Sequence, residues 1–395
     1  MNNFGKRLWA EINLDNLIYN FNAVKKLLPQ GTLACCVIKA DAYGHNAVRV
    51  ATELQGAGAD WMAVSNIEEA LELRNSGITL PLLILGYTPP ECASELCKNN
   101  ISQCVYSLEY ARQLSKYAKD FGGVINVHIK IDTGMGRIGF ACGNEATASE
   151  IIDACKLPGI YPEGIFTHFA MSDCGECGED FTRAQARSFI TLVNELKTRG
   201  LDFKYVHSSN TAAALDYPEF SMNMARIGIA LYGLLPSDTL RNTQRLKPVM
   251  SLKTVISHVK DVEAGATVSY GCRFVADRPM KIATVPMGYA DGFWRSNLDG
   301  GVRLLIHGKR VKIIGSICMD QLMLDVTEVE NVRMGDEVTV FGDAEGICPC
   351  DAIARANNTI NYEIICSVGK RVPRVFIKNG EIDEIRLGLI DTIIK

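Results

Sequence analysis

Short apolar runs alternate with helical patterns through roughly the first 245 residues. The strand-like runs are Leu33–Ile38, Trp61–Val64, Leu82–Leu85, Gln103–Tyr106, Val124–Ile131, Gly164–Thr167, Phe203–Val206 and Met224–Ala230. Helical spacing of apolar residues lies between several of them, at Ala47–Leu54, Ile67–Arg74 and Phe181–Leu201. Strands that alternate with helices predict parallel βα units. About eight such units in this length predict an α/β fold of the TIM (β/α)8 barrel type, whose sites lie at the carboxyl ends of the strands.

From about Pro248 the pattern changes to short β-like stretches separated by turn residues. They are Ser251–Val262, Thr267–Tyr270, Lys281–Pro286, Val302–Ile306, Lys309–Ile314, Gln321–Val326, Glu337–Phe341 and Arg374–Ile377. Asn379-Gly380 is the strongest hairpin signal, and one helix is expected near Asp351–Ala356. We therefore predict a barrel domain over residues 1–245 and a C-terminal β-rich domain over residues 246–395. The first few residues of the chain are candidates to join the second domain.

Composition excludes several classes of protein. The chain has 395 residues, 47% of them hydrophobic, which is enough to bury a large core. A net charge of -4 argues against nucleic-acid binding. No apolar run reaches the roughly 18 residues that span a membrane, and the N-terminus lacks the pattern of a signal peptide. A cytoplasmic protein without membrane attachment is expected.

The fourteen cysteines are scattered, and several lie in apolar runs. Metal-like spacing occurs twice, at Cys174/Cys177 and at Cys348/Cys350. Each is a lone pair without histidines in zinc-finger spacing, so we expect reduced thiols and no metal site.

Lys39 ends the apolar run Leu33–Ile38 and opens a polar segment that contains Tyr43 and Gly44. A lysine at the mouth of a buried strand can be desolvated, and burial lowers the pKa of its amine. Such an amine can form a Schiff base with an aldehyde cofactor.

Two glycine-containing segments follow later predicted strands. In the loop 132–139, Arg137 is suited to hold a carboxylate in a bidentate fork. Arg226 lies within an apolar strand, where it faces either the rim or the mouth of the barrel, and Gly228 and Ile229 offer backbone N–H groups to a phosphate. The segment 207–211 supplies hydroxyl groups for the same anion.

Two further residues are weak signals by themselves. His168 ends a strand, and a lone histidine is more often structural than catalytic. Tyr270 lies beside a glycine at a predicted turn, which is a common place for tyrosine.

Together these segments resemble the alanine racemases, which are fold-type III enzymes that use pyridoxal 5'-phosphate (PLP). The resemblance extends from Trp9–Asn13 to Arg371–Arg374, and its most specific motif is CVIKADAYGH at 36–45. The other motifs follow in family order: DTGMGRIG (132–139), ARIGIALYG (225–233), VSYG (268–271), GYADGF (288–293), ICMDQ (317–321) and TINYEI (359–364).

The resemblance implies roles for individual residues. Lys39 matches the Schiff-base lysine and first catalytic base, and Tyr270 matches the second base, which the partner subunit of a homodimer contributes. Arg226 matches the arginine that bonds the pyridine nitrogen, and His168 matches the imidazole beside it. The remaining cofactor-binding positions are Tyr43, Asn210, Thr211, Gly228, Ile229 and Tyr362.

Substrate positions and departures also follow from the resemblance. Arg137 and Met319 match contacts to the carboxylate of a small amino-acid substrate, the latter across the dimer, and Lys130 matches a lysine that is often carbamylated and orders Arg137. Ser316 stands where an arginine often lines the substrate corridor, whereas Arg295 matches the other corridor arginine. Asn46 replaces a usual glycine, and Thr211 replaces a usual serine and keeps its hydroxyl.

These residue types suit racemisation, which removes the α-proton from one face of the substrate and returns one on the other. A lysine and a tyrosine on opposite faces can do so. An arginine stays protonated, so Arg226 leaves the pyridine nitrogen neutral and weakens the ring as an electron sink. That disfavours transamination. The expected product, D-alanine, feeds peptidoglycan synthesis in the family.

Three other classes share part of this pattern. A serine-preferring racemase of the vancomycin-resistance type carries an added membrane portion, and it tends to have a smaller polar residue at the position of Tyr362. A two-domain PLP decarboxylase pairs the pyridine nitrogen with an acidic residue, unlike Arg226. A non-enzymatic single-barrel PLP-binding protein lacks the β-rich domain and any equivalent of Tyr270.

Overall fold

The computed structural model describes residues 6–242, 245–342, 349–389 and 392–394. Its chain forms two compact units. One unit contains Ile18–Ala42 and Ala47–Leu246, and the other contains Met1–Leu17, Tyr43–Asn46 and Lys247–Lys395. The chain therefore passes from the first unit to the second within the CVIKADAYGH motif and returns to the first after Asn46.

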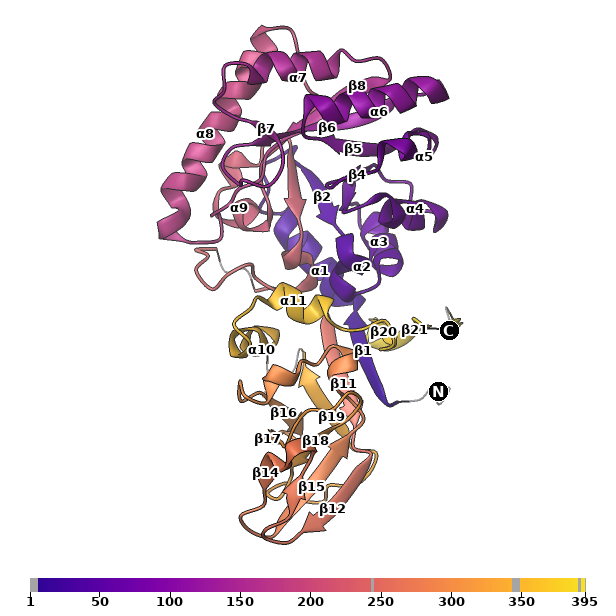
Figure 1. Cartoon of the computed structure of the whole chain (residues 1–395), viewed down its shortest axis with the longest axis vertical. Helices are drawn as coiled ribbons and strands as arrows, with labels where there is room; N and C mark the ends of the chain where they lie inside the picture. The colour runs from indigo at the N-terminus through magenta and orange to yellow at the C-terminus, as the bar shows by residue number, and fades with distance from the viewer. Residues whose placement is uncertain (1–5, 243–244, 343–348, 390–391, 395) are drawn as a thin grey trace. The chain divides into compact units, whose positions relative to one another are not determined.

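The first unit is a nearly closed barrel of eight parallel strands, as predicted (Figure 1). In spatial order they are β10 (Met224–Ile227), β2 (Leu33–Val37), β3 (Trp61–Val64), β4 (Leu82–Ile84), β5 (Ile101–Val105), β6 (Ile125–Asp132), β8 (Ile160–Phe166) and β9 (Tyr205–His207), while β7 (Phe140–Ala141) pairs with β6. Between β9 and β10, Arg226 N donates to Ser209 O at 3.1 Å. All residues of β3 and β5 are buried, because both faces of a parallel sheet are covered.

Helices follow most of the barrel strands. They are α1 (Leu14–Lys25), α3 (Ala47–Gly56), α4 (Ile67–Asn75), α5 (Ala93–Lys98), α6 (Leu108–Phe121), α7 (Thr147–Cys155), α8 (Glu176–Thr198) and α9 (Thr211–Asp216). The helix α6 shows why these segments fold locally. Ser107 caps its first turn by accepting from Tyr110 N, Gly122 ends it in a left-handed conformation, and Ala111, Leu114 and Ala118 bury one face.

The second unit contains an eleven-stranded sheet. In spatial order its strands are β12 (His258–Val262), β15 (Met280–Val285), β18 (Leu322–Asp325), β17 (Lys309–Ile314), β16 (Arg303–Ile306), β19 (Glu337–Phe341), β11 (Met250–Val255), β1 (Leu8–Asn13), β20 (Arg374–Lys378), β21 (Glu381–Leu387) and β22 (Thr392–Ile394). The N-terminal strand β1 pairs antiparallel with β11 and parallel with β20. Residues from both ends of the chain thus form one sheet.

Several sequence predictions in this unit are confirmed. Asn379 and Gly380 join β20 to β21, with φ values of 54° and 76°. These angles suit a tight hairpin turn. The helix predicted near Asp351–Ala356 is α10 (Cys350–Ala356), and α11 (Asn361–Cys366) follows it.

Three predicted strands were too long. The stretch Ser251–Val262 is two strands, β11 and β12. The strand predicted over Thr267–Tyr270 ends at Val268 in β13 (Thr267–Val268), and the one over Met224–Ala230 ends at Ile227 in β10. Short 3-10 helices, η4 (Tyr270–Cys272) and η3 (Ile229–Tyr232), follow β13 and β10. Apolar composition alone does not distinguish a strand from such a turn.

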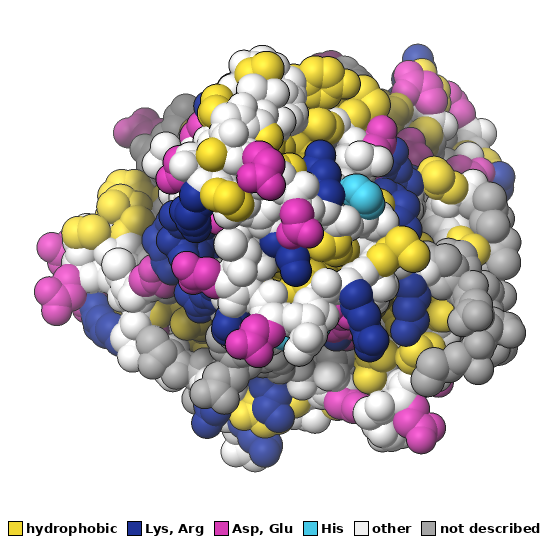
Figure 2. All heavy atoms as spheres, turned by 90° about the horizontal axis from the view of Figure 1, so that it is seen from below, with side chains coloured by type: hydrophobic (Ala, Val, Ile, Leu, Met, Phe, Trp, Pro, Cys, Tyr) yellow, Lys and Arg dark blue, Asp and Glu magenta, His cyan; other side chains and the backbone are white. Residues whose placement is uncertain are grey.

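No helix within the described residues is long and apolar enough to cross a membrane. On the face shown in Figure 2, basic and acidic side chains are interspersed, with small groups in which Lys and Arg side chains adjoin one another. The same described part of the chain has no group of three or more His, Cys, Asp or Glu side chains that could hold a metal ion. Cys174, Cys177 and Cys350 are free thiols, and Cys348 lies outside the described residues.

Candidate active site

Lys39 begins α2 (Lys39–Gly44), directly after the buried end of β2. Four successive residues of α2, Ala40 to Tyr43, have φ values between 52° and 54°. This left-handed turn costs roughly 1–2 kcal/mol per non-glycine residue, and such strain concentrates at functional sites. The sequence predicted a tight polar turn here but not its hand. Lys39 is partly exposed rather than buried, which corrects the expectation of a desolvated amine.

The second unit holds the end of this turn. Gly44 has a φ of 81°, and a Cβ at this position would lie 2.5 Å from Ile365 O. Arg374 Nε donates to Gly44 O at 3.0 Å. Tyr43 and Tyr362 lie with their rings 5.9 Å apart. Burial raises the pKa of Tyr43, so its phenol is a neutral hydrogen-bond donor.

Arg226 lies inside the barrel on β10 and is 2% exposed. Its guanidinium donates to His207 Nδ1 at 2.9 Å, to Thr167 O at 2.8 Å and to Ser208 O at 3.0 Å. Burial lowers its pKa to about 10, which leaves the side chain protonated near neutral pH. The sequence left open whether this side chain faces the rim or the mouth of the barrel, and the structure instead places it in the barrel interior.

His168 follows β8 and lies beside this arginine, with Nδ1 3.2 Å from Arg226 Nη2. Burial, and then the charge of Arg226, hold the pKa of His168 well below its ordinary value. The barrel therefore combines a protonated guanidinium with a neutral imidazole.

The turn between β9 and η3 contains the predicted phosphate-binding positions. Thr211 Oγ1 accepts from Gly228 N at 2.8 Å, and Ile229 opens η3. Asn210 caps α9 by accepting from Ala213 N, and it also accepts from Ser172 at 2.9 Å. The hydroxyls of Ser208 and Ser209 bond to Phe220 O and Ser221 Oγ, respectively. Of the predicted hydroxyls in this segment, Thr211 therefore remains the best placed for an anion.

Arg137 is exposed at the tip of the glycine-rich loop that follows β6. The loop is fixed by Asp132, whose carboxylate accepts from Gly134 N at 2.9 Å and from Gly136 N at 3.1 Å. Lys130, on β6, is buried, and its amine donates to Ile131 O at 2.7 Å. Burial lowers the pKa of Lys130 to about 8, and the charges of Arg226 and Arg137 act in the same direction.

Tyr270 belongs to the second unit, where its side chain is 72% exposed. Its backbone is held on both sides, because Ser316 Oγ donates to Tyr270 O at 3.1 Å and Ser269 Oγ donates to Ser316 O at 2.7 Å. Ser269 has a φ of 68° and a ψ of -177°, a conformation that is rare outside glycine. Ser316 is buried and supports Tyr270, so it does not offer a corridor side chain, whereas Arg295 is exposed.

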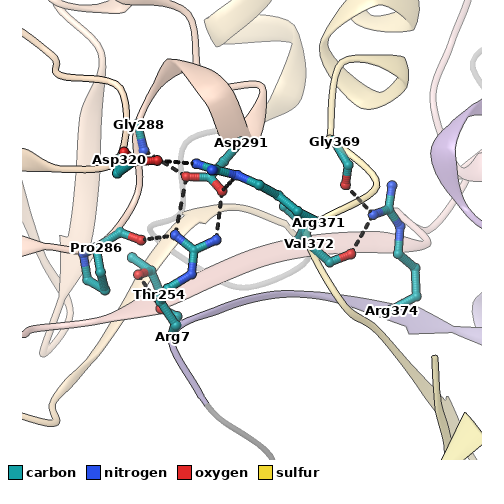
Figure 3. Close-up of polar contacts among 10 residues, drawn as sticks. All are labelled: Arg7, Thr254, Pro286, Gly288, Asp291, Asp320, Gly369, Arg371, Val372 and Arg374. Atoms are coloured by element: carbon teal, nitrogen blue, oxygen red, sulfur yellow. Dashed lines mark hydrogen bonds and ion pairs between the residues drawn. The ribbon is translucent and has the colours of Figure 1, made fainter. Parts of the chain in front are cut away.

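Met319 lies on the neighbouring loop and is 53% exposed. Its carbonyl accepts from Ala290 N at 3.1 Å, and a Cβ on Gly288 would lie 2.3 Å from it. Figure 3 shows how Asp291 supports this turn, because Arg7 and Arg371 both reach its carboxylate and Arg371 also reaches Asp320. The GYADGF and ICMDQ motifs therefore contact each other and together fix the loop that carries Met319.

The sequence did not identify Asp291, the buried His207 and His128, or the partly buried Glu163 as part of these sites. For Asp291 the GYADGF motif was a signal, since a glycine-rich turn around one carboxylate indicates a fixed loop. For His128 the signal was its place within the apolar run Val124–Ile131, and His207 directly follows the run Phe203–Val206.

The barrel carries a lysine, a buried arginine and a neutral histidine at the ends of its strands. The same chain continues into a β-rich unit that presents a tyrosine. These features together define a class of enzyme that acts on small amino acids. Both family models for this class match: the alanine racemase N-terminal domain over residues 12–236 and the alanine racemase C-terminal domain over residues 249–376.

Similar proteins share nearly the whole chain. An alanine racemase of Clostridium tetani is 44% identical over 381 residues, which cover 96% of this chain and 97% of that protein. A solved alanine racemase of Clostridium difficile has a TM-score of 0.92 at 44% identity and covers 97% of this chain and 99% of its own. One from Bacillus anthracis, with bound L-Ala-P, has a TM-score of 0.92 at 36% identity, with coverage of 98% and 100%. The chain belongs to the alanine racemase family, and it is an amino-acid isomerase.

Proposed function

We propose that this chain interconverts L-alanine and D-alanine by a two-base mechanism that uses PLP, with Lys39 of one subunit and Tyr270 of its partner as the bases. The observation that carries the proposal is Arg226, a buried and protonated side chain with His168 beside it at the end of the barrel. Residues 1–245 and 246–395 would be the barrel and β-rich domains of this enzyme.

The side chains present suit the chemistry of PLP. Its phosphate is a dianion, for which the phenol of Tyr43, the hydroxyl of Thr211 and the N–H groups of Gly228 and Ile229 are suitable donors, and we assign Tyr362 and Asn210 to the same role. Its pyridine nitrogen is an acceptor, and Arg226 can only donate. Lys39 supplies the primary amine that an aldehyde requires. When bound, PLP supplies an electron-withdrawing ring that acidifies the α-hydrogen of an amino acid.

The chain's own residues then account for the stereochemistry. Lys39 removes or returns the proton on one face of the substrate, and Tyr270 does so on the other. Arg137 and the backbone near Met319 hold the substrate carboxylate, which fixes the α-carbon between the two bases. Because Arg226 stays protonated, it would donate to the ring nitrogen of bound PLP and leave that nitrogen neutral. This restrains electron withdrawal and disfavours transamination.

Exposure of Tyr270 and Met319 supports a shared site in a homodimer. Both side chains are exposed, yet both lie on backbone that is held by Ser316, Gly288 and Asp291. A rigid, exposed pair of residues is what a subunit needs if it completes the site of another. D-Alanine made in this way would supply peptidoglycan synthesis in the cytoplasm.

Racemisation of L-alanine and L-serine by the purified protein with PLP tests the proposal. We expect D-alanine as the main product, and some turnover of serine, because a small apolar pocket rejects an added hydroxyl only weakly. A protein that binds PLP but racemises neither amino acid would overturn the proposal.

Two variants test the assignment of the bases. Tyr270→Phe should retain PLP but lose most exchange of the α-proton of L-alanine. Mixed dimers of inactive Lys39→Ala and Tyr270→Phe subunits should regain activity, because one of their two sites contains both bases. Verified heterodimers without recovered activity would argue against the shared site.

A further inference from the structure

A chain of buried side chains leads away from Arg226 through the interior of the barrel. Arg226 Nη1 lies 2.9 Å from His207 Nδ1, and His207 Nε2 lies 2.9 Å from His128 Nδ1. His128 Nε2 lies 3.4 Å from Glu163 Oε1, a close polar contact whose geometry is not that of a formed hydrogen bond, and the same oxygen accepts a hydrogen bond from Ser102. Both imidazoles are fully buried. The chain joins four strands, β10, β9, β6 and β8.

The protonated guanidinium fixes the direction of every bond in this chain. Arg226 can only donate, so His207 Nδ1 must accept, and a neutral His207 then carries its proton on Nε2. That proton is donated to His128 Nδ1, which leaves the proton of neutral His128 on Nε2, facing Glu163. Burial holds the pKa of His207 well below its ordinary value and also lowers that of His128, so both rings are neutral near pH 7.

Two features of the backbone build the far end of the chain. Between β6 and β8, Val127 pairs with Pro162 and His128 pairs with Gly164, so Glu163 is an extra residue in a β-bulge. Bulges re-aim side chains and are rare between parallel strands. A Cβ at Gly164 would lie 2.4 Å from His128 Nδ1, so the glycine makes room for the imidazole.

Charge supplies an independent reason for this arrangement. Arg226 is buried, and its guanidinium donates to neutral groups, which are two imidazoles and the carbonyls of Thr167 and Ser208. A buried cation is costly without a nearby negative charge. The carboxylate of Glu163 is held ionised, because polar contacts with His128 and Ser102 lower its pKa against the effect of burial.

We propose that Glu163 is a positioning residue for Arg226, acting through His128 and His207 as a remote counter-charge for the protonated guanidinium. The consequence for catalysis rests on the proposed function, since Arg226 is there the donor to the cofactor ring. Each imidazole then presents a lone pair toward the arginine and a proton toward the carboxylate. The guanidinium is thereby held as a directed donor inside the barrel.

Nitrogen-15 NMR of histidine-labelled protein without cofactor tests the relay directly, since the sequence has six histidines. We expect His128 and His207 to be neutral at pH 7 with the proton on Nε2. In Glu163→Gln we expect both tautomers to stay, because Arg226 sets them, and the Nε2 resonance of His128 to shift, because a neutral amide replaces the carboxylate that this nitrogen faces. A proton on Nδ1 of His128 in the unsubstituted protein would overturn the proposal, even if the variant did not fold.

Kinetics of the PLP-loaded enzyme supply the second readout. Removing an outer-shell partner of a functional histidine commonly costs roughly 10- to 100-fold, and for this remote charge we expect kcat for L-alanine to fall about tenfold. KM should stay within about twofold, because Arg137 and Met319 are untouched. Gly164→Ala, which displaces His128, should lower kcat in the same way. Glu195→Gln, which alters an exposed ion pair with Arg199, should leave kcat unchanged.

The outcomes separate the relay from the enzymatic proposal. An unchanged Nε2 resonance of His128 together with unchanged kcat in Glu163→Gln would contradict the relay and leave the racemase assignment intact. Unsubstituted protein that shows the expected tautomers but does not racemise alanine would contradict the proposed function instead.

Discussion

Arg371 Nε donates to Asp291 Oδ1 at 2.8 Å, across 80 positions of the chain, and the same oxygen accepts from Arg7 Nη2 at 2.7 Å. Asp291 is almost fully buried, whereas both arginines are partly exposed. The carboxylate therefore joins the N-terminal strand, the GYADGF turn and the segment before β20. Through Gly288 N, which donates to Asp291 Oδ2 at 2.9 Å, it also fixes the turn that supports Met319.

Asp291→Asn should destabilise the second unit. The amide keeps the shape but loses the charge opposite two arginines, and breaking a buried charged pair typically costs about 3–5 kcal/mol. We expect about 2–4 kcal/mol here, since both arginines reach solvent. Urea unfolding measures it. Asp320→Asn is the matched control, because it removes the exposed partner of the same Arg371 and should cost at most about 1 kcal/mol.

The same carboxylate predicts a dependence of stability on acid. Burial alone would raise the pKa of Asp291, but hydrogen bonds from Arg7 and Arg371 hold it below its ordinary value. A carboxylate with a lowered folded-state pKa stabilises the protein above its unfolded-state pKa, and this contribution is lost as pH falls through the folded-state value. We expect stability to fall below about pH 4, with a shallower fall in Asp291→Asn. If stability fell equally with decreasing pH in both proteins, Asp291 would not be the cause of the acid dependence.

Much of the barrel could be predicted because strands buried on both faces appear as continuous apolar runs. Trp61–Val64 is a strand with the predicted bounds. The left-handed turn at Ala40–Tyr43 could not be predicted, because alanine and tyrosine rarely adopt positive φ and a run of four such residues is rarer still. Its conformation is imposed by the surrounding fold.

The candidate site was predicted to the extent that it lies in contiguous motifs. Residues such as Arg226 and Thr211 lie in short segments with unusual composition. The role of Glu163 could not be predicted from such a segment. Its side chain is directed by a bulge, which depends on the register between β8 and β6, a strand more than 30 positions away. The partnership of Arg7 with Asp291 spans 284 positions and carries no local pattern.

Gly44→Ala should impair both stability and PLP binding. The new Cβ would meet Ile365 O at 2.5 Å, and φ is 81°, so the turn that carries Tyr43 must shift. We expect a loss of about 1–3 kcal/mol by urea unfolding and weaker binding in a PLP titration. Gly56→Ala is the opposite control, because Gly56 lies in α3 with no atom within 4 Å of the added Cβ. There, alanine should stabilise the protein by about 0.5–1 kcal/mol.

Ser316→Ala should lower activity through Tyr270. The substitution removes the hydroxyl that donates to Tyr270 O at 3.1 Å and leaves that carbonyl less constrained. One such hydrogen bond contributes about 0.5–1.5 kcal/mol, which corresponds to a loss of about 2- to 10-fold in kcat if it positions the phenol. Steady-state racemisation of L-alanine measures this loss. Ser316→Thr keeps a hydroxyl and should retain more activity than Ser316→Ala, unless the buried site rejects the added methyl group, which a lowered Tm would reveal.

Lys130 is expected to form a carbamate with dissolved carbon dioxide, which requires a neutral amine. Burial lowers its pKa to about 8, so the neutral fraction rises as pH increases through this value, well below the range of an ordinary lysine. The change also replaces a buried cation near Arg226 and Arg137 with an anion, which the local charges favour. Carbon-13 NMR with labelled bicarbonate should show a signal that grows from pH 7 to pH 9. Lys130→Ala should abolish it and Lys98→Ala, an exposed control, should not. A signal that is absent at pH 9, or that persists in Lys130→Ala, would contradict carbamylation at this site.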